Sequence, residues 1–420
     1  MSVRLHTLAN GVRVLCDPMP GLETIALTVV AGRGAACEDA ARSGWSHLME
    51  HMVFKGAGER SARQIVEAIE SEGGQINAAT GYERTSFQIR ALKGGLPLGM
   101  EVLADLVLRP TLSEGDLERE KSVVGQEIAE ANDTPDDLVF ELAQSAAFED
   151  QPLGRPILGT VDSIAAATPQ TLGDWRAALY APDRLVVSAA GAVDEDELLA
   201  LANQAFGAVQ GQGAPESPAN SFTGGRRPTI RKLEQAHFVA MLPAPGSKDA
   251  AYFALRVFAE ALGGGMSSRL FQEAREKRGL AYSIDAYADT YADTGLLGLY
   301  AGCQAKDAAE LARVAAGEIA SLLTNIDEAE LARSKAQLKA HLFMGAERPL
   351  ARAEQSAGQV LMFGEAFTSA HLAASIDAVT AADIAALAER LTGPRKAVGA
   401  VLGPKAAMAA PQAFEQALFG

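Results

Sequence analysis

The segment His47-Leu48-Met49-Glu50-His51 carries three side chains that could perform chemistry together. If it forms a helix, His47 and His51 are four residues apart and lie on one face, with Glu50 between them in angle. Two imidazoles at this spacing can bind one metal ion, and this inverted order of His and Glu is typical of zinc peptidases. The alternative is a pair of histidines beside a salt-bridging glutamate.

A candidate for the third metal ligand lies on a long helix predicted over residues 113–132. Glu120 and Glu127 are two turns apart and share a face. Val123 and Val124 also lie on that face, which predicts that it points inward. Buried carboxylates are costly unless something compensates them, and a zinc ion would compensate Glu127. Glu120 would then orient another ligand. Charged neighbours leave open the alternative that both glutamates are solvated.

Three protein ligands would leave a fourth position for water, whose pKa zinc lowers to about 7. Glu50 could take the proton of this water and pass it to a leaving amine. The sequence contains no G-x-S-x-G elbow and no phosphate-binding loop with lysine. The pattern therefore predicts peptide-bond hydrolysis without a serine or cysteine nucleophile.

The elements that position these residues alternate between strands and helices, which indicates an α+β or α/β domain. Asn10-Gly11 predicts a hairpin with a type I′ turn. Ser61 and Gln64 predict a capping box, and Gly73-Gly74 predicts the end of that helix. We also expect strands at 24–31, 75–79 and 85–92, and helices at 42–54, 61–72, 96–108 and 113–132.

The chain divides into two halves. Residues 210–228 are rich in Gly, Pro and Ser and predict a linker between an N-terminal catalytic domain, 1–209, and a C-terminal domain, 229–420. LSEGDLEREK from Leu112 is similar to IDEAELARSK from Ile326, which indicates two copies of one domain. Two unrelated helices with similar caps are the alternative.

Composition narrows the function classes. The formal net charge of -16 argues against binding to nucleic acid and permits basic ligands, although it also serves solubility. No run of eighteen apolar residues exists, so we expect no membrane span. We expect the cytoplasm, because no signal-like segment opens the chain and the three cysteines, Cys16, Cys37 and Cys303, have no disulfide or metal-site spacing.

Over nearly its whole length, the sequence resembles the pitrilysin/insulinase family of zinc metallopeptidases, on the branch of the mitochondrial processing peptidase and its bacterial relatives. The resemblance rests on HLMEH at 47–51, EREKSVVGQEI around Glu127, GGQINAATGYERTSF at 73–87 and SSRLFQEAREKRGLAYSI at 267–284. It implies one Zn²⁺ per chain, bound by His47, His51 and Glu127. Glu50 would be the general base and Glu120 the supporting acid.

The resemblance also implies roles for residues outside the metal motif. Asn77, Ala78 and Ala79 would line the cleft and bind substrate backbone as an added strand. Arg275 and Tyr282 would donate hydrogen bonds to a substrate carbonyl or to the developing oxyanion. The position that repeats Glu127 in the second half is His341, so a second metal site is not expected.

The architecture implied by the family is two homologous α/β-roll domains, each with helices on a mostly antiparallel sheet, facing each other as a clamshell around a chamber. Such chains commonly pair, and we expect a homodimer. The expected activity is that of an endopeptidase or oligopeptidase acting on unstructured peptides, with basic ones favoured by the acidic charge. The alternatives are a non-catalytic structural subunit, as among respiratory-complex core proteins, and a subunit that needs a partner for turnover.

Overall fold

The computed structural model describes residues 3–211, 213 and 217–420, which form two compact units. The first unit contains Met1–Ala129, Arg155–Pro218 and Phe343–Ser369. The second contains Glu130–Gly154, Ala219–Leu342 and Ala370–Gly420. Each unit therefore includes a segment from the opposite half of the sequence, which the predicted division into 1–209 and 229–420 does not anticipate.

The first unit is built on a six-stranded sheet with the order β1-β2-β8-β3-β7-β6. Strands β2 and β8 are parallel, and the other neighbouring pairs are antiparallel. The strands are β1 (Arg4–Thr7), β2 (Arg13–Pro18), β3 (Thr24–Ala31), β6 (Gln75–Thr80), β7 (Thr85–Leu92) and β8 (Leu185–Gly191).

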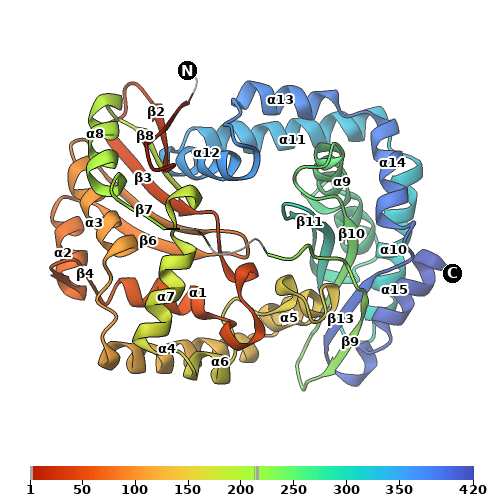
Figure 1. Ribbon diagram of the computed structural model, residues 1–420. Coiled ribbons are helices and arrows are strands. Elements are labelled where there is room, and N and C mark those ends of the chain that lie inside the picture. Colours follow the sequence, from red (N-terminus) through yellow and green to blue (C-terminus); the bar gives the residue numbers. More distant parts are fainter. Residues whose placement is uncertain (1–2, 212, 214–216) are drawn as a thin grey trace. The chain divides into compact units, whose positions relative to one another are not determined.

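Alternate residues of each strand point to opposite faces of the sheet, and both faces are covered by helices. Leu27 and Val29 of β3 join a core cluster with helices α1, α3 and α8. Val30, the residue after Val29, points to the other face and packs with Ala357 and Val360 of helix α12 (Pro349–Phe363). Figure 1 shows α12 beside β2 and β8. A helix from the second half of the sequence thus completes the first unit.

The second unit repeats this topology with five strands in the order β11-β12-β10-β13-β9. Its one parallel pair, β9 and β13, corresponds to β2 and β8, and the antiparallel pairs follow in the same order. This agreement supports the predicted duplication. The strands are β9 (Gly225–Ile230), β10 (Ala236–Ala244), β11 (Ala281–Thr290), β12 (Gly295–Cys303) and β13 (Val398–Gly403).

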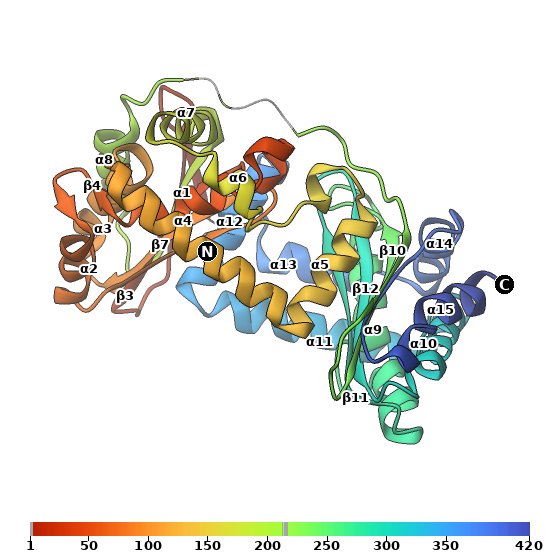
Figure 2. The ribbon, with the colours of Figure 1, turned by 90° about the horizontal axis from the view of Figure 1, so that it is seen from below.

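Helix α5 (Pro135–Ala147), from the first half of the sequence, covers one face of this second sheet (Figure 2). Its Phe140 ring stacks on Tyr300 of β12, with 5.4 Å between ring centroids. Leu299 and Ala301, on either side of Tyr300, face the opposite core with helices α9 and α10. The two units therefore exchange equivalent helices, α5 for α12.

The remaining helices are bounded as follows: α1 (Trp45–Val53), α2 (Ala62–Ser71), α3 (Leu96–Leu108), α4 (Glu114–Asp133), α6 (Val161–Ala165), α7 (Pro169–Leu179), α8 (Glu195–Phe206), α9 (Tyr252–Gly263), α10 (Ala308–Thr324), α11 (Glu328–Ala346), α13 (Ser369–Ala378), α14 (Ala381–Leu391) and α15 (Ala410–Phe419). In the described ranges no single helix is long and apolar enough to cross a membrane, although the bent pair α13 and α14, at 84°, passes the same test when taken together.

The α+β class is confirmed, and so are most predicted elements of the first half. Helix α3 and strands β3 and β7 have the predicted bounds, and Ser61 and Gln64 form the predicted capping box. The predicted linker, 210–228, extends too far, because strand β9 begins at Gly225. Residues 212 and 214–216 of the linker lie outside the described residues. The type I′ turn is wrong, since only Gly11 of the Asn10-Gly11 pair has a positive φ, and the loop spans residues 8–12.

Candidate metal centre

Helix α1 presents the HLMEH segment with a fixed orientation. Leu48, Met49, Met52 and Val53 are fully buried in the core of the first unit. These four residues occupy one side of the helix, so His47, Glu50 and His51 project from the other side. The helix also packs against the edge strand β6. Burial of the apolar side therefore determines where the three functional side chains point.

Helix α4 supplies the glutamates. Leu117, Glu120 and Val124 are buried, which gives the helix an inward face as predicted. Val123, which we expected on that face, is 38% exposed. On a 3.6-residue helix, Val123 and Leu117 fall on opposite flanks of Glu120, and the helix buries the flank of Leu117. Glu127 lies near the boundary, with its side chain 36% exposed.

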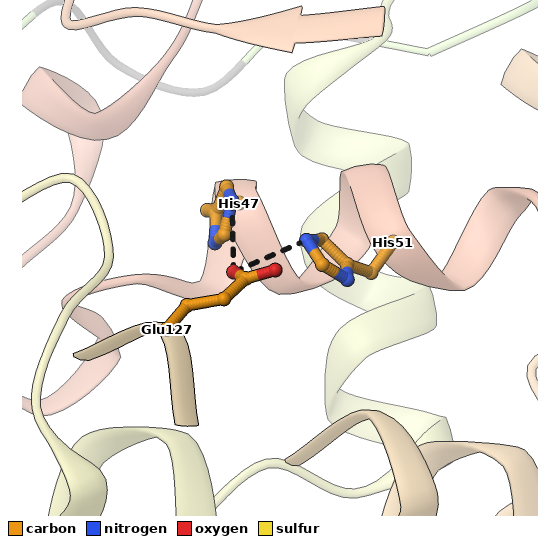
Figure 3. A group of neighbouring side chains, drawn as sticks. All are labelled: His47, His51 and Glu127. Atoms are coloured by element: carbon orange, nitrogen blue, oxygen red, sulfur yellow. Dashed lines mark ion pairs between the residues drawn. The ribbon is translucent and has the colours of Figure 1, made fainter. Parts of the chain in front are cut away.

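His47, His51 and Glu127 come together at one point (Figure 3), and one ligand atom from each lies within 4.8 Å of the others. The Oε2 atom of Glu127 is 3.8 Å from Nε2 of His47 and 3.5 Å from Nε2 of His51. Donors held about 2.1 Å from a tetrahedral zinc ion are about 3.4 Å apart. Two nitrogens and one carboxylate oxygen at these separations fit zinc.

The electrostatics of His47 suit a metal ligand. Burial, with a smaller contribution from His51, lowers the pKa of His47 to about 4. The imidazole is therefore neutral at neutral pH, which is the form that binds metals. Its Nδ1 atom is buried and has no hydrogen-bond partner within the described ranges.

His51 is oriented from behind by Glu120. The Nδ1 atom of His51 is 3.1 Å from Oε2 of Glu120, whose side chain is only 6% exposed. If Nδ1 carries the proton and donates it to Glu120, the lone pair of Nε2 is directed toward Glu127. Lys55 Nζ lies 2.8 Å from the other oxygen of Glu120 and compensates its charge. Glu120 thus contacts the face of His51 opposite the candidate metal position, as an orienting role would require.

Glu50 lies beside this group with the properties of a proton acceptor. Its burial raises its pKa, as does the negative charge of Glu127, while hydrogen bonding by Thr80 and the charge of His51 oppose the shift. One carboxylate oxygen, Oε2, is buried and lacks a hydrogen-bond partner in the described part of the chain. A partly desolvated carboxylate with a raised pKa next to a potential metal site is typical of a general base.

The predicted substrate-binding residues lie on β6, which pairs only with β7 among the strands described. Asn77 and Ala79 are exposed, whereas Ala78 is buried. An edge strand of this kind presents unpaired backbone groups. Because β6 packs against α1, its residues lie near the helix that carries the histidines.

Arg275 and Tyr282 belong to the second unit, where the structure brings them together. Arg275 lies on the π-helix η5 (Phe271–Lys277), with its guanidinium 4.6 Å from the ring of Phe271 and 5.7 Å from that of Tyr282. Tyr282, at the start of β11, is 78% exposed. Their reach to a substrate stays a prediction.

Two contributors to the site were missed in the sequence. Lys55 neutralises Glu120, and Thr80, the last residue of β6, hydrogen-bonds Glu50. Lys55 follows His51 by four residues, so its spacing could have indicated that it lies on the side of the helix that faces Glu120. Thr80 gave no such signal, because its position depends on how β6 packs against α1.

Comparison with known proteins places the chain in a family. The model described as "Insulinase (Peptidase family M16)" matches residues 13–161, and "Peptidase M16 inactive domain" matches residues 166–338. An uncharacterized zinc protease of Mycobacterium tuberculosis is 36% identical over 411 residues, covering 96% of this chain and 94% of the relative.

Solved structures with 20% identity share the fold. A protease from Helicobacter pylori has a TM-score of 0.88, with 96% of this chain and 99% of that chain covered. A chain of complex III from Candida albicans has a TM-score of 0.87, with both chains fully covered. The relative at 36% identity and the two family-model matches show that the chain belongs to the M16 family of peptidases, whose curated members similar to it are named zinc proteases.

Proposed function

We propose that this chain is a zinc-dependent endopeptidase or oligopeptidase that hydrolyses unstructured peptides. The observation that carries the proposal is the meeting of His47, His51 and Glu127 within 4.8 Å, beside a buried oxygen of Glu50 that has no hydrogen-bond partner among the described residues. The first three would hold the metal, and Glu50 would move protons. A purely structural cluster has no need of a desolvated carboxylate with such an unsatisfied oxygen.

The residues divide the chemistry between them. Zinc, when bound, polarises the scissile carbonyl and lowers the pKa of a water molecule. Glu50 accepts a proton from that water and then donates it to the leaving amine. Its raised pKa brings it nearer to the operating pH, which suits both steps. Glu120 keeps His51 in the tautomer and orientation that expose Nε2, and Lys55 forms an ion pair with the other oxygen of Glu120.

Substrate binding is proposed to use the edge of the first sheet. An extended peptide would add to β6 as a further strand, with Asn77, Ala78 and Ala79 contributing backbone hydrogen bonds. This mode needs an unfolded segment, so folded proteins would be excluded. Arg275 and Tyr282 are proposed to donate hydrogen bonds to a substrate carbonyl or to the oxyanion.

The charge of the chain supports a preference for basic peptides. At a net charge of -16, a cationic substrate is attracted and an anionic one repelled, and salt screens both effects. Cleavage of matched basic and acidic peptides at low and high salt tests this preference. Equal rates at low salt would contradict it. The proposed homodimer is tested by mass in solution, and a monomer mass at all concentrations would refute it.

The decisive assay is cleavage of a quenched, disordered peptide by the purified chain with zinc, beside Glu50→Gln. The variant keeps the size of the side chain and the three metal ligands but loses the base. We expect turnover by the parent and at least a hundredfold slower turnover by the variant. A parent that binds zinc yet cleaves nothing would instead favour a non-catalytic or partner-dependent subunit. That alternative is supported by the match to the inactive-domain model and by the likeness to a complex III chain.

A further inference from the structure

We propose that Glu38 is a positioning residue for the metal helix: its carboxylate fixes the N-terminus of α1 and so sets the direction of His47 and His51. This inference rests on the proposed function, because it gives Glu38 a role in metal binding. Glu38 lies nine residues before His47, outside the HLMEH motif, and its side chain is in the first unit with the metal group.

Both oxygens of Glu38 are used at the start of the helix. Oε2 accepts a hydrogen bond from the backbone N–H of Gly44, and Oε1 accepts one from the N–H of Ser46, each at 2.7 Å. The first N–H groups of a helix have no partner within the helix and need an outside acceptor. Ser46 directly precedes His47, so the second hydrogen bond restrains the backbone next to a metal ligand.

The helix cannot provide this cap from its own N-cap residue. Gly44 has a φ of +87°, and a Cβ atom there would lie 2.5 Å from the carbonyl oxygen of Leu158 and 2.7 Å from Cα of Gly159. The N-cap position therefore lacks a side chain that could accept from the helix amides. Glu38 reaches in from the preceding loop and replaces it.

The same end of the helix is held from a second side. The indole N–H of Trp45 donates to the carbonyl of Ser163 at 2.8 Å, and the hydroxyl of Ser163 donates to the carbonyl of Ser43 at 2.6 Å. These bonds locate the helix end in the unit, whereas Glu38 satisfies the helix amides themselves. The two contributions can therefore be separated by mutation.

The environment of the Glu38 carboxylate is unfavourable for a negative charge. The residue is 3% exposed, and within the described ranges no lysine or arginine forms an ion pair with its carboxylate. Arg155 donates to the backbone carbonyl of Glu38 rather than to its side chain, and it acts on the carboxylate only through its charge. The helix dipole favours an anion at this end. The carboxylate is suited to the position because it offers two acceptor oxygens, whereas an amide offers one.

The test compares Glu38→Gln and Glu38→Asp with Asp39→Asn. Glutamine keeps the size but offers one acceptor, and aspartate keeps the charge but is one methylene shorter. Asp39→Asn is the matched control, because Asp39 caps the neighbouring short helix Ala40–Arg42 and touches nothing in α1 among the contacts described. Zinc affinity is measured by competition with a chromophoric chelator, and site geometry by the visible spectrum of the Co²⁺-loaded protein.

We expect Glu38→Gln to bind zinc about tenfold or more weakly and to shift the Co²⁺ spectrum, with Glu38→Asp intermediate and Asp39→Asn unchanged. If Glu38→Gln does not fold, Glu38→Asp decides alone. Wild-type zinc affinity and an unchanged Co²⁺ spectrum in the folded variants would overturn the proposal. Neither readout needs catalysis, so a wild-type chain that binds zinc but cleaves no peptide would refute the proposed function while leaving this test intact.

Discussion

Replacement of Glu120 by glutamine tests how far zinc binding depends on the orientation of His51. The Glu120 side chain is 6% exposed and has two partners, His51 Nδ1 at 3.1 Å and Lys55 Nζ at 2.8 Å. Glutamine offers one acceptor oxygen and adds an NH₂ group that repels either donor. One of the two partners must lose its hydrogen bond. The charged ammonium of Lys55 is the stronger donor and takes the amide oxygen, so the NH₂ group faces His51, which loses the acceptor that fixes its ring.

The expected magnitude follows from this geometry. Loss of the partner that orients a metal-binding histidine typically weakens metal binding by about 10- to 100-fold, or about 1.4–2.8 kcal/mol. Zinc affinity of Glu120→Gln should fall by this amount when measured by chelator competition at pH 7.5. The matched control is Glu118→Gln on the same helix, whose side chain is 65% exposed and pairs with Lys121. It should leave zinc affinity unchanged. Equal affinities for the two variants would refute the orienting role of Glu120.

Three further predictions concern stability and can be checked by urea or thermal unfolding of the metal-free protein. Burial raises the pKa of Glu38 from its ordinary 4.5 to about 7, so the stability that its protonated form contributes is present below pH 4.5 and lost as the pH rises through 7. Relative to Glu38→Gln, the wild type should therefore lose about 2–3 kcal/mol between pH 5 and pH 8, and parallel pH profiles would contradict this. Asp17→Asn should lower the free energy of unfolding by about 3–5 kcal/mol, because Asp17 is 1% exposed and accepts hydrogen bonds from Arg352 at 2.6 and 2.5 Å. The exposed pair Arg63–Glu67 is the control, and Glu67→Gln should change the free energy of unfolding by less than about 1 kcal/mol. Gly44→Ala should be clearly more destabilising than Gly94→Ala, since both glycines have positive φ but a Cβ meets nothing within 4 Å at Gly94; equal costs would show that the contact with Leu158 is not limiting.

The sequence was most informative where local patterns decide the structure. The four-residue spacing of His47 and His51 on a helix placed these side chains and Glu50 together. The bounds of α3 and the capping box of α2 also follow from nearby residues. Apart from the family resemblance, the approach of Glu127 to the histidines was predicted only as a compensated buried charge, because the packing of α4 beside α1 is a tertiary property.

The features that sequence reasoning missed depend on contacts between distant segments. An amphipathic helix shows which of its sides is apolar but not which sheet it covers, so the exchange of α5 and α12 between the units was not foreseen. The first residues of strand β9, 225–228, were assigned to the linker because the segment 210–228 is rich in Gly, Pro and Ser, and the parallel pairing of β9 with β13 supplies the missing stabilisation. Val123 was predicted to face inward because both flanks of Glu120 were taken to be buried, whereas the helix buries only the flank of Leu117.

The most direct test of the metal centre is anomalous X-ray diffraction at the zinc edge from crystals of the zinc-loaded chain. We predict a single strong peak per chain, bound by Nε2 of His47, Nε2 of His51 and the carboxylate of Glu127, with Glu50 close by but not a ligand. The same crystals of Glu127→Gln, grown at limiting zinc, should show a weaker peak or none. An ion bound elsewhere, or no zinc peak in the wild type at saturating zinc, would contradict the account.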